Sequence, residues 1–83
     1  MEILWHKNAI EDYKTWQKTD ESSFNRLNCL IKECLLNPYS GNGNPRQLKG
    51  VLNNYWSRRI NDEHRIVYKV HEGDLVIIQC RFH

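Results

Sequence analysis

Residues 55–82 read YWSRRI, NDEH, RIVYKV, HEGD and LVIIQCRF in chain order, and the succession of these segments determines the architecture. The runs at 55–60, 65–70 and 75–82 are rich in β-branched, aromatic and alternating residues, which favours strands. The polar segments between them, 61–64 and 71–74, have the composition of turns. The sequence therefore predicts a three-stranded antiparallel β-meander.

Alternation along these strands separates an apolar face of the sheet from a polar face. The apolar face is predicted to pack on the rest of the chain and holds Ile66, Tyr68, Val70, Val76, Ile78, Cys80 and Phe82. The polar face receives Arg59, Arg65, Lys69, Gln79, Arg81 and His83. Cations that converge without an acid repel each other, so this face is expected to bind an anion such as a phosphate. The alternative is that a one-sided sheet simply exposes a solvated face.

The first half of the chain is predicted to form a strand and a helix hairpin. Residues 2–6 are short and apolar, as in a strand. Apolar residues at three- and four-residue spacings predict one helix over 8–18 and a second helix that ends at Asn37-Pro38. A glycine- and proline-containing loop follows at 39–45. The expected class is α+β: an N-terminal strand, a two-helix hairpin and then the antiparallel β-meander.

The chain has 83 residues, which fits one small domain spanning 1–83. The three cysteines are too few and too widely spaced to predict a disulfide framework or a zinc site. No segment approaches the roughly 20 apolar residues of a membrane span, and no signal peptide is expected. Residues 46–83 hold seven cations and four acids, a net charge of +3, whereas residues 1–45 have a net charge of −1. A phosphate-bearing partner is therefore expected at the second half.

Several motifs together carry a family resemblance. They are Ile3-Leu4-Trp5, Pro38 with Gly41-x-Gly43-x-Pro45, Leu48-Lys49, Tyr55-Trp56-Ser57-Arg58-Arg59-Ile60, Glu63-His64-Arg65-Ile66-Val67-Tyr68 and Cys80-Arg81-Phe82-His83. With these motifs, essentially the whole chain closely resembles the YoeB-type toxins of the RelE superfamily. The resemblance implies a small RelE-like fold of the microbial-ribonuclease type.

The same resemblance implies the toxin of a toxin-antitoxin pair. Such a toxin is a ribosome-dependent endoribonuclease, or mRNA interferase, that cuts messenger RNA in the ribosomal A site by 2′-hydroxyl attack, with no metal or other cofactor. The implied partners are a cognate antitoxin of the YefM type, the ribosome and messenger RNA, with operator DNA reached only through the antitoxin. Relatives also imply that a homodimer can form. No membrane partner is expected, and the expected location is the cytoplasm.

The chemistry of this reaction accounts for two of the residues that the resemblance marks as catalytic. The attacking hydroxyl needs a base, the leaving alkoxide needs an acid, and the phosphoryl group needs donors for its oxygens. Arg65 is the natural phosphate clamp, because its planar guanidinium can contact two phosphate oxygens at once; the alternative is a surface ion pair with Glu63 or Asp62. His83 matches the position of the family's general acid. Relatives are expected to carry a tyrosine after it, so the chain either is naturally shorter or lacks that residue.

Arg46 is the sharpest departure from the family pattern, which has a glutamate, taken as the general base, at this position. A guanidinium cannot accept a proton at neutral pH. The chain is then a natural weak or inactive member, a divergent member with another base, or an engineered variant. Glu63 and neutral His83 are the candidate substitute bases. The alternative function is a catalytically weakened or inactive toxin that binds the ribosome and the antitoxin without efficient cleavage.

Three further cations are predicted to contact phosphates of messenger or ribosomal RNA, from their charge and their matching positions. They are Lys49, Arg59 and Arg81. The alternative for each is solubilising surface charge. Trp56 and Tyr68 alternate with charged positions in apolar strands, so they are expected to belong to the core rather than to stack on bases.

Overall fold

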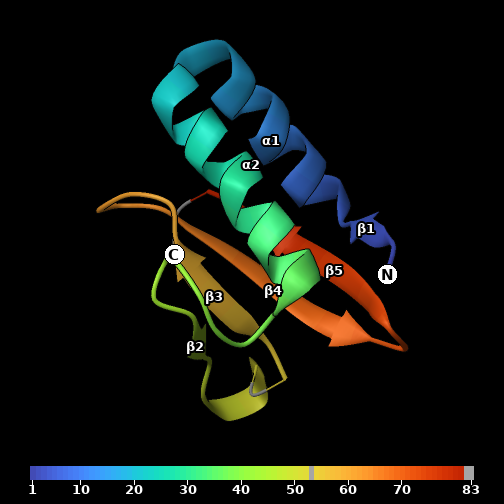
Figure 1. Ribbon diagram of the computed structural model, residues 1–83. Coiled ribbons are helices and arrows are strands. Elements are labelled where there is room, and N and C mark those ends of the chain that lie inside the picture. Colours follow the sequence, from blue (N-terminus) through green and yellow to red (C-terminus); the bar gives the residue numbers. More distant parts are fainter. Residues whose placement is uncertain (53, 82–83) are drawn as a thin grey trace.

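The computed structural model describes residues 1–52 and 54–81, in which two helices lie on one face of a mixed sheet (Figure 1). In chain order the elements are β1 (Ile3–Trp5), α1 (Lys7–Thr19), α2 (Glu21–Leu36), β2 (Arg46–Gln47), the 3-10 turn η1 (Gly50–Leu52), β3 (Trp56–Arg59), β4 (Arg65–His71) and β5 (Asp74–Gln79). The predicted α+β class is confirmed, with the strand, the helix hairpin and the meander in the predicted order.

Each of the two helices begins with a side-chain N-cap. The His6 Nδ1 atom accepts from the Asn8 N–H at 3.2 Å and so caps the start of α1. Asp20 separates the helices: its own N–H donates to the Trp16 carbonyl at the end of α1, and its carboxylate accepts from the Ser23 N–H at the start of α2. Such side-chain acceptors satisfy the amide groups that a first helical turn leaves unpaired. One aspartate thereby fixes the sharp turn of the hairpin.

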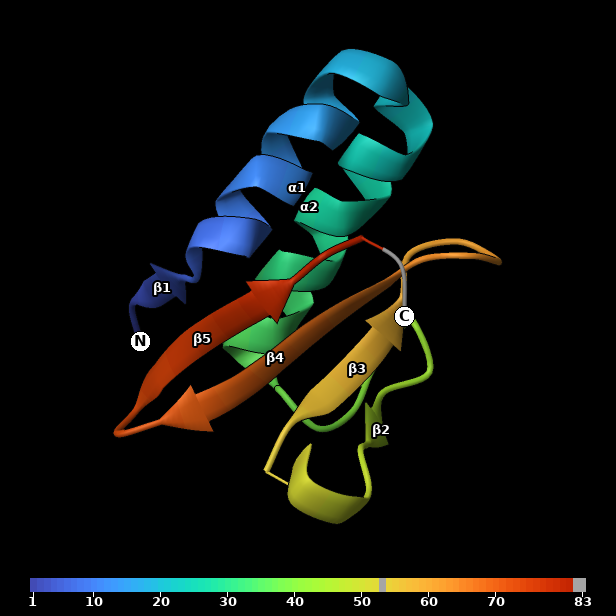
Figure 2. The same ribbon diagram turned by 180° about the vertical axis from the view of Figure 1, so that it is seen from behind.

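The sheet, as far as the chain is described, has five strands in the order β1-β5-β4-β3-β2. The three antiparallel strands β3, β4 and β5 form the predicted meander. The N-terminal strand β1 adds to one edge, parallel to β5, and the two-residue strand β2 adds to the other edge, antiparallel to β3. The sequence did not predict β2, because two residues cannot show a strand period. Figure 2 shows the face of this sheet that the helices leave uncovered.

The core lies between the helices and the sheet. Its buried side chains are Ala9, Trp16, Leu27, Leu30, Ile31, Cys34, Ile60, Ile66, Tyr68, Leu75, Ile77 and Cys80. Next to this cluster, the Tyr13 ring packs edge-on between Trp5 and Phe24, with centroids 5.1 and 4.9 Å away. Full burial of an aliphatic side chain contributes about 1.5–3 kcal/mol, so this cluster is the main source of stability.

A bulge in β5 corrects the predicted assignment of faces. Val76 and Ile78 were expected to face the core, but the residues buried on β5 are Leu75 and Ile77. The register passes from Tyr68 opposite Ile77 to Val67 opposite Gln79, which leaves Ile78 as an extra residue. An extra residue shifts the alternation by one. The chain beyond the bulge therefore returns to the predicted phase, with Cys80 buried, whereas Phe82 lies outside the described residues.

Candidate functional site

The sheet face turned away from the helices carries a pocket of about 640 Å³, which we name the cationic pocket. It is lined by Arg46, Gln47, Leu48, Lys49, Tyr55, Ser57, Arg65, Val67, Ile78 and Gln79. Three of these are among the residues singled out from the sequence, namely Arg46, Lys49 and Arg65. They come from β2, from the segment after it and from β4.

Strand register explains how residues that are distant in the chain meet here. Arg46 lies opposite Ser57, and Ser57 lies opposite Val67. Val67 in turn lies opposite Gln79. Residues that are directly opposite on paired strands point to the same face, so these four form one row across β2, β3, β4 and β5. The bulge at Ile78 brings Gln79 into this row, because regular alternation from buried Ile77 would turn Gln79 inward.

Arg65 lies two residues before Val67 on β4 and therefore points to the same face. Its Nη1 atom is buried and has no hydrogen-bond partner among the described residues. A buried donor without a partner costs about 1–3 kcal/mol. Arg65 also lines the cationic pocket, so its charged guanidinium can attract an anion held there.

The pocket combines positive charge with an apolar wall. The positive charge comes from Arg46, Lys49 and Arg65, and none of the described lining residues carries a carboxylate. Val67 and Ile78 supply aliphatic surface beside these cations. Such a lining suits a ligand that has both a charged group and a flat apolar group, as a nucleotide does.

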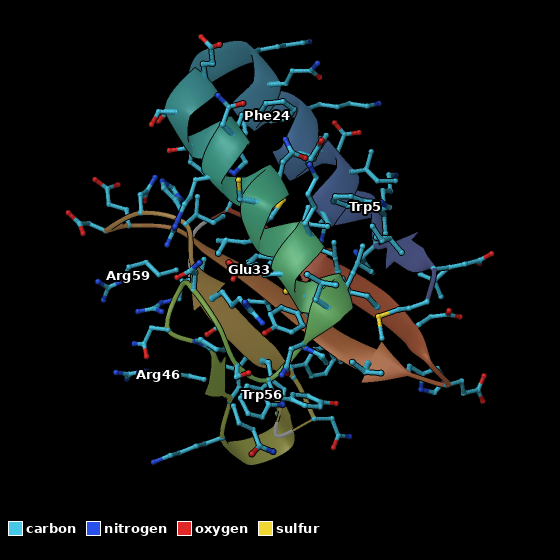
Figure 3. All side chains as sticks on the ribbon, in the orientation of Figure 1. Trp5, Phe24, Glu33, Arg46, Trp56 and Arg59 are labelled. Atoms are coloured by element: carbon cyan, nitrogen blue, oxygen red, sulfur yellow. The ribbon has the colours of Figure 1, made fainter. Side chains whose placement is uncertain are left out.

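Arg46 extends from β2 into solvent at one side of the molecule, where Arg59 also projects (Figure 3). When the amide oxygen of Asn44 is turned toward Arg46, it accepts from Nε at 3.1 Å and from Nη2 at 3.3 Å. This contact orients the guanidinium. Arg46, the residue that departs from the family pattern, is thus an exposed cation that lines the cationic pocket.

The other two predicted phosphate ligands do not line the cationic pocket. Arg59 is exposed and lies directly opposite Arg65 on β3, so it extends the positive face beside the pocket. Arg81 follows β5, and its guanidinium carbon lies 5.9 Å from the centroid of the Trp16 ring on α1. Arg81 is therefore directed to the helix side of this end of the sheet.

Of the remaining two predicted catalytic residues, Glu63 is described and does not line the cationic pocket. Glu63 lies in the turn between β3 and β4 with its side chain 85% exposed, and its carboxylate is 3.8 Å from His64 Nε2. It lines a separate pocket of about 340 Å³, together with Trp16 and Asp20 among others. The structure does not bring Glu63 next to Arg46. His83 lies outside the described residues.

Sequence reasoning missed Arg58, which is fully buried. Its Nε donates to the Tyr68 hydroxyl at 3.0 Å, and its Nη1 donates to the Asn42 carbonyl at 3.1 Å. Its Nη2 donates to the carbonyls of Asn37 and Ser40. Arg58 thus holds the loop that leads from α2 to β2, and with it Arg46. The signal was present in the sequence, because strand alternation places neighbouring arginines on opposite faces.

Burial keeps two thiols and one phenol of the core protonated, so none of them is available as a base. Desolvation raises the pKa of Tyr68 to about 12 and the pKa of Cys80 to about 12, and it also raises the pKa of Cys34. These groups therefore stay neutral at physiological pH. No group of three or more potential metal ligands occurs in residues 1–52 and 54–81. Neither described helix has the length and hydropathy that crossing a bilayer requires.

Known proteins are similar to this chain in both sequence and fold. A family model for the YoeB-like toxin of bacterial type II toxin-antitoxin systems matches residues 5–83. Toxin YoeB of Synechocystis is 48% identical over 82 residues, which cover 99% of this chain and 90% of the relative. Toxin YoeB of Escherichia coli K12 is 42% identical over 83 residues, which cover 100% and 99%.

Solved structures agree with the sequence relatives. A YoeB/ParE toxin from Agrobacterium tumefaciens superposes with a TM-score of 0.96 at 44% identity, covering 100% of this chain and 99% of the other. The heterotetrameric YoeB-YefM toxin-antitoxin complex from Staphylococcus aureus gives a TM-score of 0.91 at 39% identity, with 100% and 97% coverage. A YoeB dimer from the same organism gives 0.92 at 39% identity, with the same coverage.

Proposed function

Since the chain belongs to the YoeB-like toxins of bacterial type II toxin-antitoxin systems, we propose that it is a ribosome-dependent endoribonuclease that cuts messenger RNA in the ribosomal A site. Toxins of this family are generally ribonucleases. The observation that supports the finer assignment is the cationic pocket, in which strand pairing brings Arg46, Lys49 and Arg65 together without an acidic residue among the described lining.

In the proposed reaction the 2′-hydroxyl of one nucleotide loses its proton and attacks the adjacent phosphorus. The new 2′-O–P bond forms as the P–O5′ bond breaks, and the leaving 5′-oxygen takes up a proton. The products are a cyclic phosphate and a free 5′-hydroxyl. Arg65 would donate to the non-bridging oxygens, where negative charge develops. His83 is assigned as the acid from the family resemblance.

The residue that would act as the base in this reaction is not identified among the described residues of the cationic pocket. Arg46 occupies the position of the family's glutamate and lines the pocket, but it cannot accept the proton. Glu63 is exposed in a different pocket, so its use as a base would need a movement of the β3–β4 turn. This arrangement favours a second candidate function, in which the toxin binds the ribosome and blocks translation with little cleavage.

A translating extract with primer extension tests both candidates. Arg65→Ala is expected to abolish cleavage in the A site, because the clamp on the phosphate is removed. Arg46→Glu is expected to increase cleavage at least tenfold, because it introduces the missing base; one general base typically contributes about 10²–10⁴ in rate. Lys14→Ala, an exposed cation on α1, serves as the control. If Arg46→Glu and the unmodified chain both block translation without breaks, the endoribonuclease assignment is wrong.

We also infer the partners from the family. The antitoxin would be a YefM-type protein with an acidic or amphipathic segment that folds over the positive face, and operator DNA would be reached only through it. The toxin is expected to act in the cytoplasm, where translating ribosomes are present, and to form a homodimer in the absence of the antitoxin. Size-exclusion chromatography of the chain alone and with the product of a neighbouring short reading frame would reveal both assemblies.

A further inference from the structure

A second pocket, of about 360 Å³, has no role in the reaction described above. We name it the aromatic pocket. It is lined by Tyr39, Gln47, Asn54, Trp56, Lys69, Val70 and His71. It lies at the end of the sheet where β3 begins and β4 ends.

Two aromatic rings form its most distinctive part. The ring centroids of Tyr39 and Trp56 are 4.9 Å apart, and the ring planes are tilted by 48°. Trp56 packs against the core as the sequence predicted, yet it also lines the pocket. The Tyr39 residue is 51% exposed. The pair therefore presents aromatic surface to a ligand while one ring remains anchored in the protein.

The backbone on both sides of Tyr39 is fixed by buried groups. The Pro38 carbonyl accepts from the Tyr68 hydroxyl at 2.6 Å. The Ser40 carbonyl accepts from Arg58 Nη2 at 2.8 Å. Both donors belong to residues that are fully buried on the sheet. An exposed ring that is held in this way costs little conformational entropy when a ligand binds to it.

The charge of the aromatic pocket favours an anion, and the pocket adjoins the cationic pocket. Lys69 supplies a positive charge and none of the described lining residues is acidic, although the Glu72 carboxylate lies 3.8 Å from Nε2 of the lining residue His71. Gln47 lines both pockets. In addition, Lys69 Nζ lies 5.1 Å from the centroid of the Tyr55 ring, which lines the cationic pocket. Trp56 lies opposite buried Tyr68 and therefore faces the helix side. A chain with regularly spaced negative charges and flat groups would thus pass around the end of the sheet at Gln47 to occupy both pockets.

We propose that the aromatic pocket is a second nucleotide subsite, in which one base of a single-stranded RNA stacks on Tyr39 and Trp56 while a neighbouring phosphate lies in the cationic pocket. Aromatic platforms beside a positive groove bind single strands with little dependence on base identity. An acidic peptide would use the cations but would gain little from paired rings. The subsite deepens the proposed function and rests on it, because it assumes that RNA is the ligand.

Fluorescence anisotropy with a short labelled RNA tests the subsite on the full chain. The probe is a tetranucleotide with 2′-O-methyl sugars, which cannot be cleaved by 2′-hydroxyl attack, measured at low salt. Tyr39→Ala is expected to weaken binding about tenfold, the typical loss of one stacked base. Tyr39→Phe keeps the ring and should bind nearly as tightly as the unmodified chain. Val51→Ala removes a fully exposed apolar side chain outside both pockets and should change nothing.

Probes that lack one base at a time identify the stacked nucleotide. For the unmodified chain, removal of one particular base should weaken binding about as much as Tyr39→Ala does. For Tyr39→Ala, removal of the same base should cause no further loss, because the two changes delete one interaction. A general disturbance of the fold would instead weaken all probes alike, and that result would overturn the subsite.

The outcomes separate the subsite from the function on which it rests. If Arg65→Ala weakens binding and Tyr39→Ala does not, the subsite is wrong and the RNA-binding function stands. If neither variant weakens binding, or the unmodified chain does not bind the probe, the subsite is wrong, whereas the ribosome-dependent function is decided by the primer-extension assay. If Tyr39→Ala leaves RNA binding unchanged but weakens binding of an acidic peptide, the surface is a peptide site and the proposal is overturned.

Discussion

At the level of single residues, two neighbouring arginines have unlike environments. Arg58 is fully buried and donates to Tyr68 and to loop carbonyls, whereas Arg59 is exposed beside the cationic pocket. In a count of charges from the composition, the two arginines are equivalent. Their position on opposite faces of β3 makes one a structural centre and the other a candidate ligand for phosphate.

Replacement of Arg58 should destabilise the protein strongly. Arg58→Met leaves the carbonyls of Asn42 and Ser40 and the hydroxyl of Tyr68 without their donor. The expected loss is about 3 kcal/mol in the free energy of unfolding, measured by urea denaturation. Arg59→Met, the matched control, should change stability by no more than about 0.5 kcal/mol. Equal stabilities of the two variants would contradict the structural role of Arg58.

Two buried acids should make stability depend on alkaline pH. Burial raises the pKa of Cys80 from 9.0 to about 12 and the pKa of Tyr68 from 10.0 to about 12, so both neutral forms are favoured in the folded state. Their contribution is fully present below pH 9. Above that pH the unfolded chain ionises first, and stability falls as the pH rises toward 12.

The thiol part of this effect can be isolated. Each such group lowers the free energy of unfolding by about 1.4 kcal/mol per pH unit in that range. Urea denaturation between about pH 7 and 10.5 should therefore show a shallower decline for Cys80→Ala than for the unmodified chain. Cys29→Ala removes an exposed thiol and should keep the original slope. Identical slopes for all three proteins would show that Cys80 does not contribute to the pH dependence of stability.

At the level of elements, the loop between α2 and β2 decides where the site forms. Its Gly43 has a φ of +84° and its carbonyl accepts from the Arg59 N–H. A Cβ at this position would lie 2.9 Å from Leu30 Cδ2 and 3.1 Å from Arg58 Cβ. The loop therefore packs directly on α2 and β3, and glycine is needed for both conformation and space.

Comparison of two glycines tests this packing. Gly73 has a φ of +82°, but a Cβ added there would have no atom within 4 Å, so Gly73→Ala carries only the backbone strain. Gly43→Ala adds the contact with Leu30 and should cost about 2 kcal/mol more than Gly73→Ala, as overpacking in a core does. Thermal or urea unfolding of both variants measures the difference. Similar losses of stability would mean that the loop around Gly43 shifts away from Leu30 and Arg58 at little cost.

At the level of the whole molecule, the small net charge of +2 conceals an uneven distribution. The second half of the chain supplies most of the sheet, and strand pairing places Arg46, Lys49 and Arg65 around one pocket with Arg59 beside it. Such a concentration of charge raises the local attraction for a polyanion far above what the net charge indicates.

Salt dependence of RNA binding measures this concentration. Lys49→Ala, Arg59→Ala and Arg81→Ala should each weaken binding and reduce the slope of log K against log salt concentration by about one unit for each phosphate that is no longer neutralised. The direction of Arg81 toward Trp16 predicts the smallest change for Arg81→Ala. Lys14→Ala on α1 should leave the slope unchanged. If the slope is unaltered for Lys49→Ala and Arg59→Ala, these residues do not contact phosphate and only add solubilising surface charge.

The sequence by itself determined the α+β class, the helix hairpin and the meander, because periods of 3.6 and 2 residues and the turn residues are local properties of the chain. It also identified Arg46, Lys49 and Arg65, which the structure brings together. Only the tertiary structure decided the parallel pairing of β1 with β5, the two-residue strand β2 and the bulge at Ile78. It also decided the burial of Arg58 and the pairing of Tyr39 with Trp56. These features depend on contacts between distant segments, and no local period in the sequence records which partner a strand edge or a ring will meet.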